Sequence, residues 1–180
     1  MNKTVHIRDK EFALYITEQE IIEAISRMAA AIKCDIEGQN PLFVCILSGA
    51  YMFTAELLHR ISPACEVIFA AYRSYTGDKS DGIIQEILPI NANFQQRLVI
   101  LLEDIVDTGQ TMYHVVNQLK ASGAQDVRLA TMLFKPRSLK CDLKIDYVGL
   151  EIDDAFVVGF GLDYDGLGRT TRDIYKVINN

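Results

Sequence analysis

Three carboxylates and a short threonine-glycine turn follow one apolar run of the sequence. Residues 98–102 are uninterrupted Leu, Val and Ile, and Glu103, Asp104 and Asp107 come next, around the turn at residues 108–111 (TGQT). At the start of a helix, such a turn offers free backbone amides and the positive end of the helix dipole to a phosphate. The nearby carboxylates would repel a bare phosphate, but they suit a ligand that also carries hydroxyls or a divalent cation. A sugar phosphate with Mg²⁺ meets both conditions, whereas the simpler interpretation is an acidic turn that only caps a helix.

Other phosphate, nucleotide and metal motifs are incomplete. The GxxxxGK[ST] loop is absent. A GxGxxG pattern begins at Gly159 and Gly161 but has Tyr164 in the position of its third glycine. A calcium-loop pattern that begins at Asp163 has Ile174 where its closing glutamate belongs. The run at residues 103–111 is therefore the segment that carries the chemistry.

The elements that must position these residues are apolar strands that alternate with helices. A capping-box pattern at Thr17 and Glu20 begins a helix, and a later one is expected to bury Met52, Leu57 and Leu58. The pattern predicts strands at 42–47, 67–72, 83–90, 97–102, 127–134, 148–150 and 156–159, and helices at 17–32, 51–60 and 111–121. Such alternation predicts an α/β fold around a mostly parallel sheet, in which ligands bind beyond the carboxyl ends of the strands.

Length and composition limit the classes of protein that fit. The chain has 180 residues, 49% of them hydrophobic and 23% charged, which predicts one domain over residues 1–180. A net charge of −6 argues against a surface that coats nucleic acid. The sequence has no apolar run of about 20 residues and no apolar signal core, so neither a membrane partner nor secretion is expected. The four cysteines lack metal-ligand spacing, and together these features indicate a reduced cytoplasmic enzyme.

Residues 102–112 (LEDIVDTGQTM) resemble the phosphoribosyl-pyrophosphate (PRPP) signature of the type I phosphoribosyltransferases. Four more segments match that family in order: residues 47–50 (LSGA), 73–75 (RSY), 134–136 (FKP) and 156–164 (FVVGFGLDY). The last two point to the branch that acts on 6-oxopurines such as hypoxanthine. The resemblance implies a mostly parallel twisted sheet flanked by helices, with a small hood region built from the termini.

The implied activity is purine salvage. A member of this branch transfers 5-phosphoribose from PRPP to hypoxanthine, and also to guanine, giving IMP or GMP and pyrophosphate with Mg²⁺ as cofactor. Two alternatives stay open: the same transfer to xanthine or another base, and a regulator of this fold that senses nucleotides. Such a regulator should have a basic face, whereas acidic residues exceed basic ones here by 24 to 18. The resemblance also implies a homodimer or homotetramer.

The resemblance assigns ribose, phosphate and metal roles to the signature. Glu103 and Asp104 would hold the ribose hydroxyls and, with Asp163, Mg²⁺, and Asp107 would be the general base facing the purine N7 proton. The 5′-phosphate would bind Asp107, Thr108, Gly109, Gln110 and Thr111. Gly109 would let the backbone approach this anion closely. The simpler interpretation of Asp107 is N-capping of the helix that follows.

The remaining roles belong to the other matching segments. Pyrophosphate would bind Ser48, Gly49 and Arg169. A mobile loop that closes over the reaction centre would contain Ser74 and Tyr75. The purine would bind Lys135, Phe156 and Val157. The family has a cis peptide after Leu47, often a lysine at position 48, and a bulky residue where this chain has Gly168. Simpler interpretations are a solvent-exposed Lys135, a core Phe156 and a plain hairpin tip at 73–82.

Overall fold

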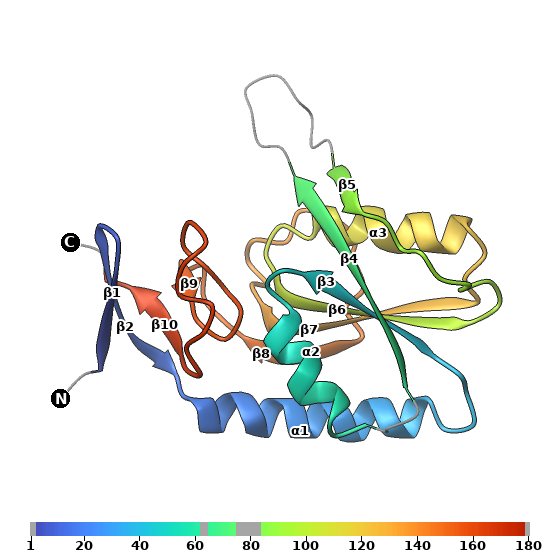
Figure 1. The fold of residues 1–180 in the computed structure, drawn as a ribbon, viewed down its shortest axis with the longest axis horizontal. Helices are drawn as coiled ribbons and strands as arrows, with labels where there is room; N and C mark the ends of the chain where they lie inside the picture. The colour runs from blue at the N-terminus through green and yellow to red at the C-terminus, as the bar shows by residue number, and fades with distance from the viewer. Residues whose placement is uncertain (1–2, 62–64, 75–83, 179–180) are drawn as a thin grey trace.

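The computed structural model describes residues 3–61, 65–74 and 84–178, and these form two sheets (Figure 1). The larger sheet has six strands in the order β5 (Ile84–Leu88), β4 (Glu66–Ser74), β3 (Leu42–Leu47), β6 (Leu98–Val106), β7 (Asp126–Phe134) and β8 (Tyr147–Glu151). Every pairing in it is parallel except that of β4 with the edge strand β5. The predicted α/β fold with a mostly parallel sheet is confirmed, and Ile83 of the predicted return strand lies outside the described residues.

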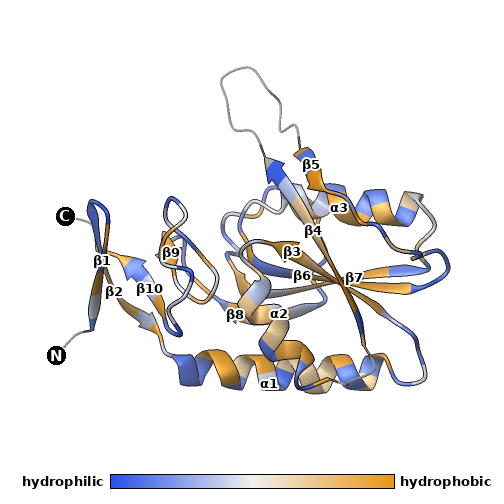
Figure 2. Ribbon diagram, in the orientation of Figure 1, coloured by the Kyte–Doolittle hydropathy of each residue, from blue (hydrophilic) through white to orange (hydrophobic). Residues whose placement is uncertain are grey.

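Helices cover both faces of this sheet. Residues of α1 (Glu18–Asp35) and α2 (Tyr51–Leu58) share one hydrophobic core with the sheet, and residues of α3 (Gln110–Ala121) share the other. Hydrophobic residues concentrate on the central strands, whereas α1 and α3 alternate between hydrophobic and hydrophilic (Figure 2). No helix in the described ranges is long and apolar enough to span a bilayer.

The three predicted helices are confirmed, but their ends differ from the predicted ones, and α2 buries a different set of side chains. The Thr17 side chain accepts the Glu20 amide, and the Glu20 carboxylate accepts the Thr17 amide, as the capping box predicts. In α2 the expected core set is wrong in part, because the helix buries Phe53, Thr54 and Leu57. Met52 and Leu58, which were expected in the core, are half-buried and pack against it. Because α2 has only eight residues, a small rotation of its axis changes which side chains face the sheet.

The second sheet joins the two ends of the chain. It has the order β1 (Thr4–Ile7), β2 (Lys10–Ile16), β10 (Ile174–Val177) and β9 (Val157–Val158), and both chain ends lie beside it (Figure 1). The hood region that the resemblance implies is therefore present, and residues 3–16 and 157–177 are called the hood below. The residue pattern did not predict β1, β2 or β10. Strands β2 and β10 pair across almost the whole length of the chain, and β1 is a four-residue strand that forms a hairpin with β2.

Strand β6 continues beyond its predicted end at residue 102. It pairs with β7 as far as Val106, so Glu103 and Asp104 lie inside the strand instead of in the loop after it. Carboxylates at these positions resemble a loop composition, but the ladder of hydrogen bonds to β7 keeps the backbone extended. Because successive side chains of a strand point to opposite faces, the two carboxylates leave β6 in different directions.

Candidate active site

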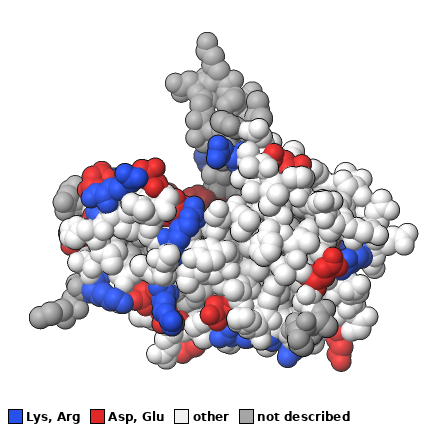
Figure 3. All heavy atoms as spheres, in the orientation of Figure 1, with Lys and Arg blue, Asp and Glu red and all other residues white. Residues whose placement is uncertain are grey.

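The candidate site lies where the carboxyl ends of β3, β6 and β7 meet the hood. A methyl group built on Gly161 of the hood would overlap the Gly49 carbonyl oxygen in the loop after β3. Lys135, directly after β7, contacts Asp107, directly after β6. Acidic side chains lie set back in the hollow between the hood and the larger sheet (Figure 3). The fold therefore brings segments from four parts of the sequence to one edge of the sheet, three of them directly after strands, as the strand pattern predicts.

Glu103 and Asp104 are carboxylates held among protein atoms. Glu103 keeps some surface toward solvent, but its Oε2 is buried and has no hydrogen-bond partner among the described residues. Burial, and then the nearby Asp104 charge, raises the pKa of Glu103 well above its usual range. Burial also raises the pKa of Asp104 to about 6, although its Oδ1 accepts the Ile105 amide at 2.8 Å and Arg169 acts in the opposite direction. Such groups call for a ligand that supplies donors or positive charge.

The two carboxylates serve different parts of the site. Glu103 lines a pocket of about 190 Å³ together with Asp107, Thr108 and the first turn of α3. Asp104 does not line this pocket, and it packs against Gly49, where any side chain would overlap its carboxylate. Glu103 therefore faces the turn before α3, and Asp104 faces the loop after β3.

The turn before α3 has the geometry of an anion site. Gly109 is the N-cap residue of α3 with a left-handed φ of 77°, and no side chain caps the helix, so the N-capping interpretation of Asp107 is wrong. The free amides at this end open onto the pocket, which Thr108 and Thr111 line and exposed Gln110 does not. Free amides and the hydroxyls beside them are suitable donors for a phosphate.

Packing against Gly109 gives a further reason for glycine at this position. A methyl group on it would come within 2.6 Å of Leu139 Cδ1 and 3.0 Å of Cys141 Sγ, so the segment after β7 packs directly onto the turn. The Lys140 amide donates to the Thr108 carbonyl at 3.0 Å from the same segment. Glycine is needed here by this packing and by the left-handed backbone, and the close approach of an anion to Gly109 stays a prediction.

Lys135 is a buried cation between two carboxylates. Its side chain is 9% exposed, and its Nζ donates to Asp107 Oδ2 at 2.8 Å and to Asp154 Oδ1 at 3.4 Å. The solvent-exposed interpretation of Lys135 is therefore wrong. Its amide donates to the Val106 carbonyl at 3.0 Å, which holds the residue beside the end of β6. Sequence reasoning missed Asp154, because nothing in its local pattern marks it as a partner of Lys135.

Phe156 lies at the surface beside this cluster. It is 44% exposed, so the interpretation as a core aromatic is wrong. Its carbonyl accepts the Val177 amide at 3.0 Å, and Val157, the next residue, is buried and pairs with Lys176 of β10. Phe156 is two residues after Asp154, which contacts Lys135, and a hydrogen bond from β10 fixes its backbone beside this cluster.

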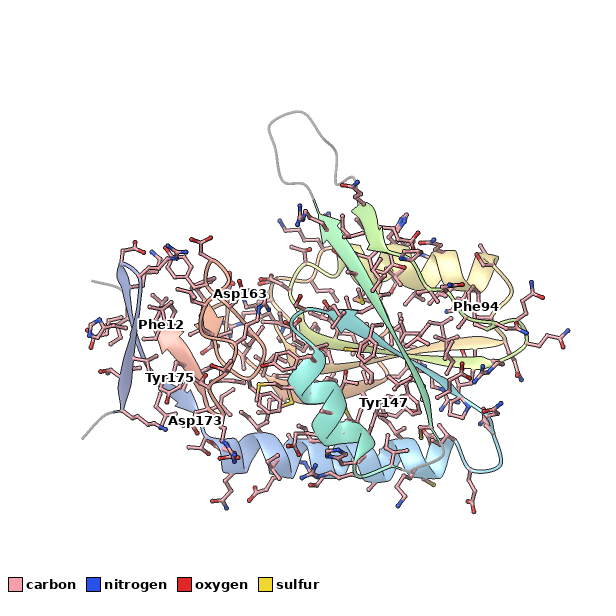
Figure 4. The ribbon with its side chains drawn as sticks, viewed as in Figure 1. Phe12, Phe94, Tyr147, Asp163, Asp173 and Tyr175 are labelled. Atoms are coloured by element: carbon pink, nitrogen blue, oxygen red, sulfur yellow. The ribbon has the colours of Figure 1, made fainter. Side chains whose placement is uncertain are left out.

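The loop after β3 meets the ion pair of the hood. The Leu47–Ser48 peptide is cis, as the resemblance implies, and Ser48 is exposed. Arg169 Nη2 lies 2.8 Å from Asp163 Oδ1, and its Nη1 donates to the Gly161 carbonyl at 2.7 Å. Asp163 lies on the side of the hood that faces the larger sheet (Figure 4). Sequence reasoning used Gly161 in a failed nucleotide motif and in the matching segment 156–164, but it missed the contact of Gly161 with Gly49.

The proposed metal ligands do not form a site on their own. Among the described residues, no three His, Cys, Asp or Glu side chains are arranged to hold a metal ion. Asp163 is paired with Arg169, and Glu103 and Asp104 leave β6 in different directions. The unpartnered carboxylate oxygen of Glu103 is nevertheless the kind of hard ligand that Mg²⁺ binds, so the residues fit a cation that arrives with a substrate.

The expected loop residues are only partly described. Ser74 is the last residue of β4, and Tyr75 lies outside the described residues.

Comparisons with known proteins agree with this geometry. The profile of the phosphoribosyl transferase domain family matches residues 15–165. Hypoxanthine-guanine phosphoribosyltransferase of Streptococcus thermophilus is 35% identical over 153 residues, 84% of this chain and 85% of that protein. The Streptococcus mutans enzyme of the same name is 38% identical over 149 residues, covering 82% and 83%.

Solved structures show the same similarity. A hypoxanthine phosphoribosyltransferase from Staphylococcus aureus superposes with a TM-score of 0.87 at 31% identity, covering 92% of this chain and 90% of that one. A hypoxanthine-guanine phosphoribosyltransferase from Bacillus anthracis has a TM-score of 0.84 at 28% identity, covering 92% and 96%.

Proposed function

This chain belongs to the phosphoribosyltransferase family, in its hypoxanthine-guanine branch, and from this premise we propose that it transfers 5-phosphoribose from PRPP to hypoxanthine. The products are IMP and pyrophosphate, and guanine gives GMP in the same way. The observation that carries the proposal is the position of buried Lys135, whose Nζ lies 2.8 Å from Asp107 beside the pocket at the start of α3. In this position Lys135 would bind the purine base beside the place proposed for the 5′-phosphate.

Lys135 supports the choice of a 6-oxopurine. A lysine ammonium group has three donors and no acceptor, so it can bond a carbonyl oxygen but not an amino group. Two of its donors face Asp107 and Asp154, which leaves one for the purine O6. The exposed ring of Phe156 would stack on the base, and the Val157 backbone would bond the base edge.

Asp107 is proposed as the general base of the transfer. As the purine N9 attacks C1′ of the ribose, the C1′–O bond to pyrophosphate breaks and its electron pair leaves with pyrophosphate. The proton on N7 passes to the Asp107 carboxylate, which prevents positive charge from building up on the purine. Base catalysis of this kind contributes about 10²- to 10⁴-fold to a rate.

The phosphate groups of PRPP are assigned to two places. The 5′-phosphate would accept hydrogen bonds from Thr108, Thr111 and the free amides at the start of α3, and Glu103 and Asp104 would accept the ribose hydroxyls. Pyrophosphate would lie at the loop of Ser48 and Gly49, with Arg169 released from Asp163 to bind it.

Mg²⁺ is proposed as the cofactor that arrives with PRPP. It would neutralise charge on the pyrophosphate leaving group, with Asp104, Glu103 and Asp163 as carboxylates to hold it. Because position 48 carries serine, the loop after β3 supplies no cation of its own, and the need for Mg²⁺ should be strict.

The test is a panel assay with PRPP, Mg²⁺ and hypoxanthine, guanine or xanthine, in which nucleotide and pyrophosphate are both quantified. We expect equimolar products with hypoxanthine and guanine, and no turnover when a chelator removes Mg²⁺. Absence of nucleotide from every 6-oxopurine would contradict the proposal, and binding of IMP without turnover would favour a nucleotide-sensing regulator.

We also propose that the chain acts in the cytoplasm, as a homodimer or homotetramer. Cys34, Cys45 and Cys141 are free thiols, which is typical of a reducing compartment. Light scattering of the purified protein tests the oligomeric state, and a monomer would contradict that part of the proposal.

A further inference from the structure

Two aromatic rings of the hood, Phe12 and Tyr164, lie against the ring of Phe156, the residue directly before the hood strand β9. The ring centroids of Phe156 and Tyr164 are 5.6 Å apart with an interplanar angle of 84°, and Phe12 lies 6.1 Å and 6.3 Å from them. Phe12 is fully buried, whereas Phe156 is 44% exposed. Because tilted and edge-to-face rings attract at these distances, Phe12 and Tyr164 restrict the orientation of the Phe156 ring.

Tyr164 is itself held by the turn between β1 and β2. Its hydroxyl donates to Asp9 Oδ1 at 2.8 Å, and Lys10 Nζ lies 5.4 Å from its ring centroid in a cation–π contact. Asp9 is in the turn, and Lys10 is the first residue of β2. The N-terminal hairpin therefore contacts the ring that contacts Phe156.

Two further contacts attach this turn to the hood loop at residues 163–168. Arg8 Nε lies 2.8 Å from Asp165 Oδ2, and both residues have a left-handed backbone, with φ of 54° and 52°. Non-glycine residues keep this conformation where surrounding contacts enforce it. A methyl group on Gly168 would come within 2.7 Å of Ile7 Cδ1, so the glycine lets the hairpin approach.

We propose that the β1–β2 turn, through Asp9 and Tyr164, positions the Phe156 ring against the purine and thereby sets the affinity for the base. The inference rests on the proposed function, in which Phe156 stacks on the base. Asp9 and Tyr164 are positioning residues, since they act through the Phe156 ring. Asp163 and Arg169, which flank Tyr164 and are assigned to Mg²⁺ and pyrophosphate, pair with each other and not with Asp9 or Phe156. Loss of the bond between Asp9 and Tyr164 should therefore change purine affinity more than PRPP affinity.

The experiment measures KM for hypoxanthine, KM for PRPP and kcat in Asp9→Ala, Asp9→Asn and Tyr164→Phe. Losing the hydrogen bond should raise KM for hypoxanthine about fivefold in Asp9→Ala and Tyr164→Phe, and leave KM for PRPP within about twofold. Asp9→Asn keeps a side-chain acceptor for the hydroxyl, so it should restore a nearly normal KM. The double variant Asp9→Ala/Tyr164→Phe should be no worse than either single variant, because both remove the same bond.

Tyr147→Phe provides a matched control. The Tyr147 hydroxyl donates to Asp35 Oδ2 at 2.7 Å, a bond as short as that of Tyr164 but outside the hood (Figure 4). This variant should leave both KM values unchanged. The inference is overturned if Asp9→Ala and Tyr164→Phe keep a normal KM for hypoxanthine, or if they raise both KM values equally.

Calorimetric titration with IMP separates this inference from the proposed function. If the wild type binds IMP without turnover, the proposed function fails, and the same variants are compared by their Kd for IMP. An approximately fivefold weaker Kd that Asp9→Asn restores supports the positioning role. An unchanged Kd, or no IMP binding by the wild type, overturns it.

Discussion

Several charged side chains at this site are buried, at a cost in free energy that a bound substrate would reduce. Lys135 is buried between Asp107 and Asp154, and Glu103 has a buried oxygen without a described partner. Buried charges are costly unless they are paired, and an acceptor left without a donor costs free energy as well. In the proposed function, PRPP and a purine would supply a donor to the Glu103 oxygen and an acceptor to Lys135, and substrate binding should offset part of this cost.

The base role of Asp107 can be tested by removing only its charge. Asp107→Asn should lower kcat at least about tenfold, because an amide cannot take up the N7 proton. Binding of PRPP should change little, since the amides at the start of α3 remain. Steady-state kinetics and PRPP titration measure both quantities, and near-normal turnover would remove Asp107 from this role.

Lys135 makes a separate prediction. Lys135→Ala should raise KM for hypoxanthine at least about tenfold, because a charge-assisted hydrogen bond to the purine O6 is lost. KM for PRPP should rise far less. Arg137→Ala, two residues further along, removes a cation that forms no described contact with the site and serves as the control. Equal effects of Lys135→Ala on both KM values would mean that Lys135 does not read the base.

At the scale of elements, the loops after the strands are fixed by close backbone contacts. Gly49 accommodates the Asp104 carboxylate, and Gly161 accommodates the Gly49 carbonyl, so the loop after β3 is enclosed by β6 and the hood. Each position needs glycine because a side chain would occupy the space of its neighbour.

Gly49→Ala should therefore damage the site. A methyl group here displaces the Asp104 carboxylate, so kcat/KM for PRPP should fall at least about tenfold, an effect typical of misplaced catalytic groups. Gly38→Ala is the control, because its left-handed φ of 73° strains alanine by about 1–2 kcal/mol while its surroundings are open. That control should lose stability and keep activity, and a pair of variants with equal activity would refute the packing argument.

The sequence predicts the elements of the larger sheet well and the hood poorly. Apolar runs such as residues 42–47 and 127–134 specify buried parallel strands by themselves, because both faces of such strands are covered. The strands β1, β2 and β10 are short, and the pairing of β2 with β10 depends on contacts between the two ends of the chain. Asp154 and Tyr164 were missed for the same reason, since their partners Lys135 and Asp9 are distant in the sequence.

At the scale of the whole molecule, the buried Asp104 carboxyl makes the free energy of unfolding depend on pH. The unfolded chain releases the Asp104 proton near pH 3.8, whereas the folded chain keeps it to about pH 6. Between these values the folded state binds more protons than the unfolded state, so the free energy of unfolding falls as pH rises. The pKa shift of Asp104 corresponds to about 3 kcal/mol in the free energy of unfolding. The chain without substrate loses this stabilisation by about pH 7.

Asp104→Asn should remove this dependence. The variant should be more stable than the wild type at pH 8, and the difference between them should shrink as pH falls from about 6 to 4. Carboxylates such as Asp173, whose pKa the bond from Lys3 lowers, act in the opposite sense at lower pH and cancel in the difference. Denaturant unfolding at several pH values measures this difference in the free energy of unfolding. A variant less stable than the wild type at pH 8 would contradict the raised pKa of Asp104.

The measurement that tests the central claim most directly is the rate of nucleotide formation from hypoxanthine and from adenine, with PRPP and Mg²⁺ in excess. Lys135 can donate to the 6-oxo group of hypoxanthine but not accept from the 6-amino group of adenine. We expect IMP and pyrophosphate in equal amounts, with kcat/KM for hypoxanthine at least about 10³-fold above that for adenine. Failure to form IMP, or equal use of adenine, would contradict the claim that this site transfers phosphoribose to 6-oxopurines.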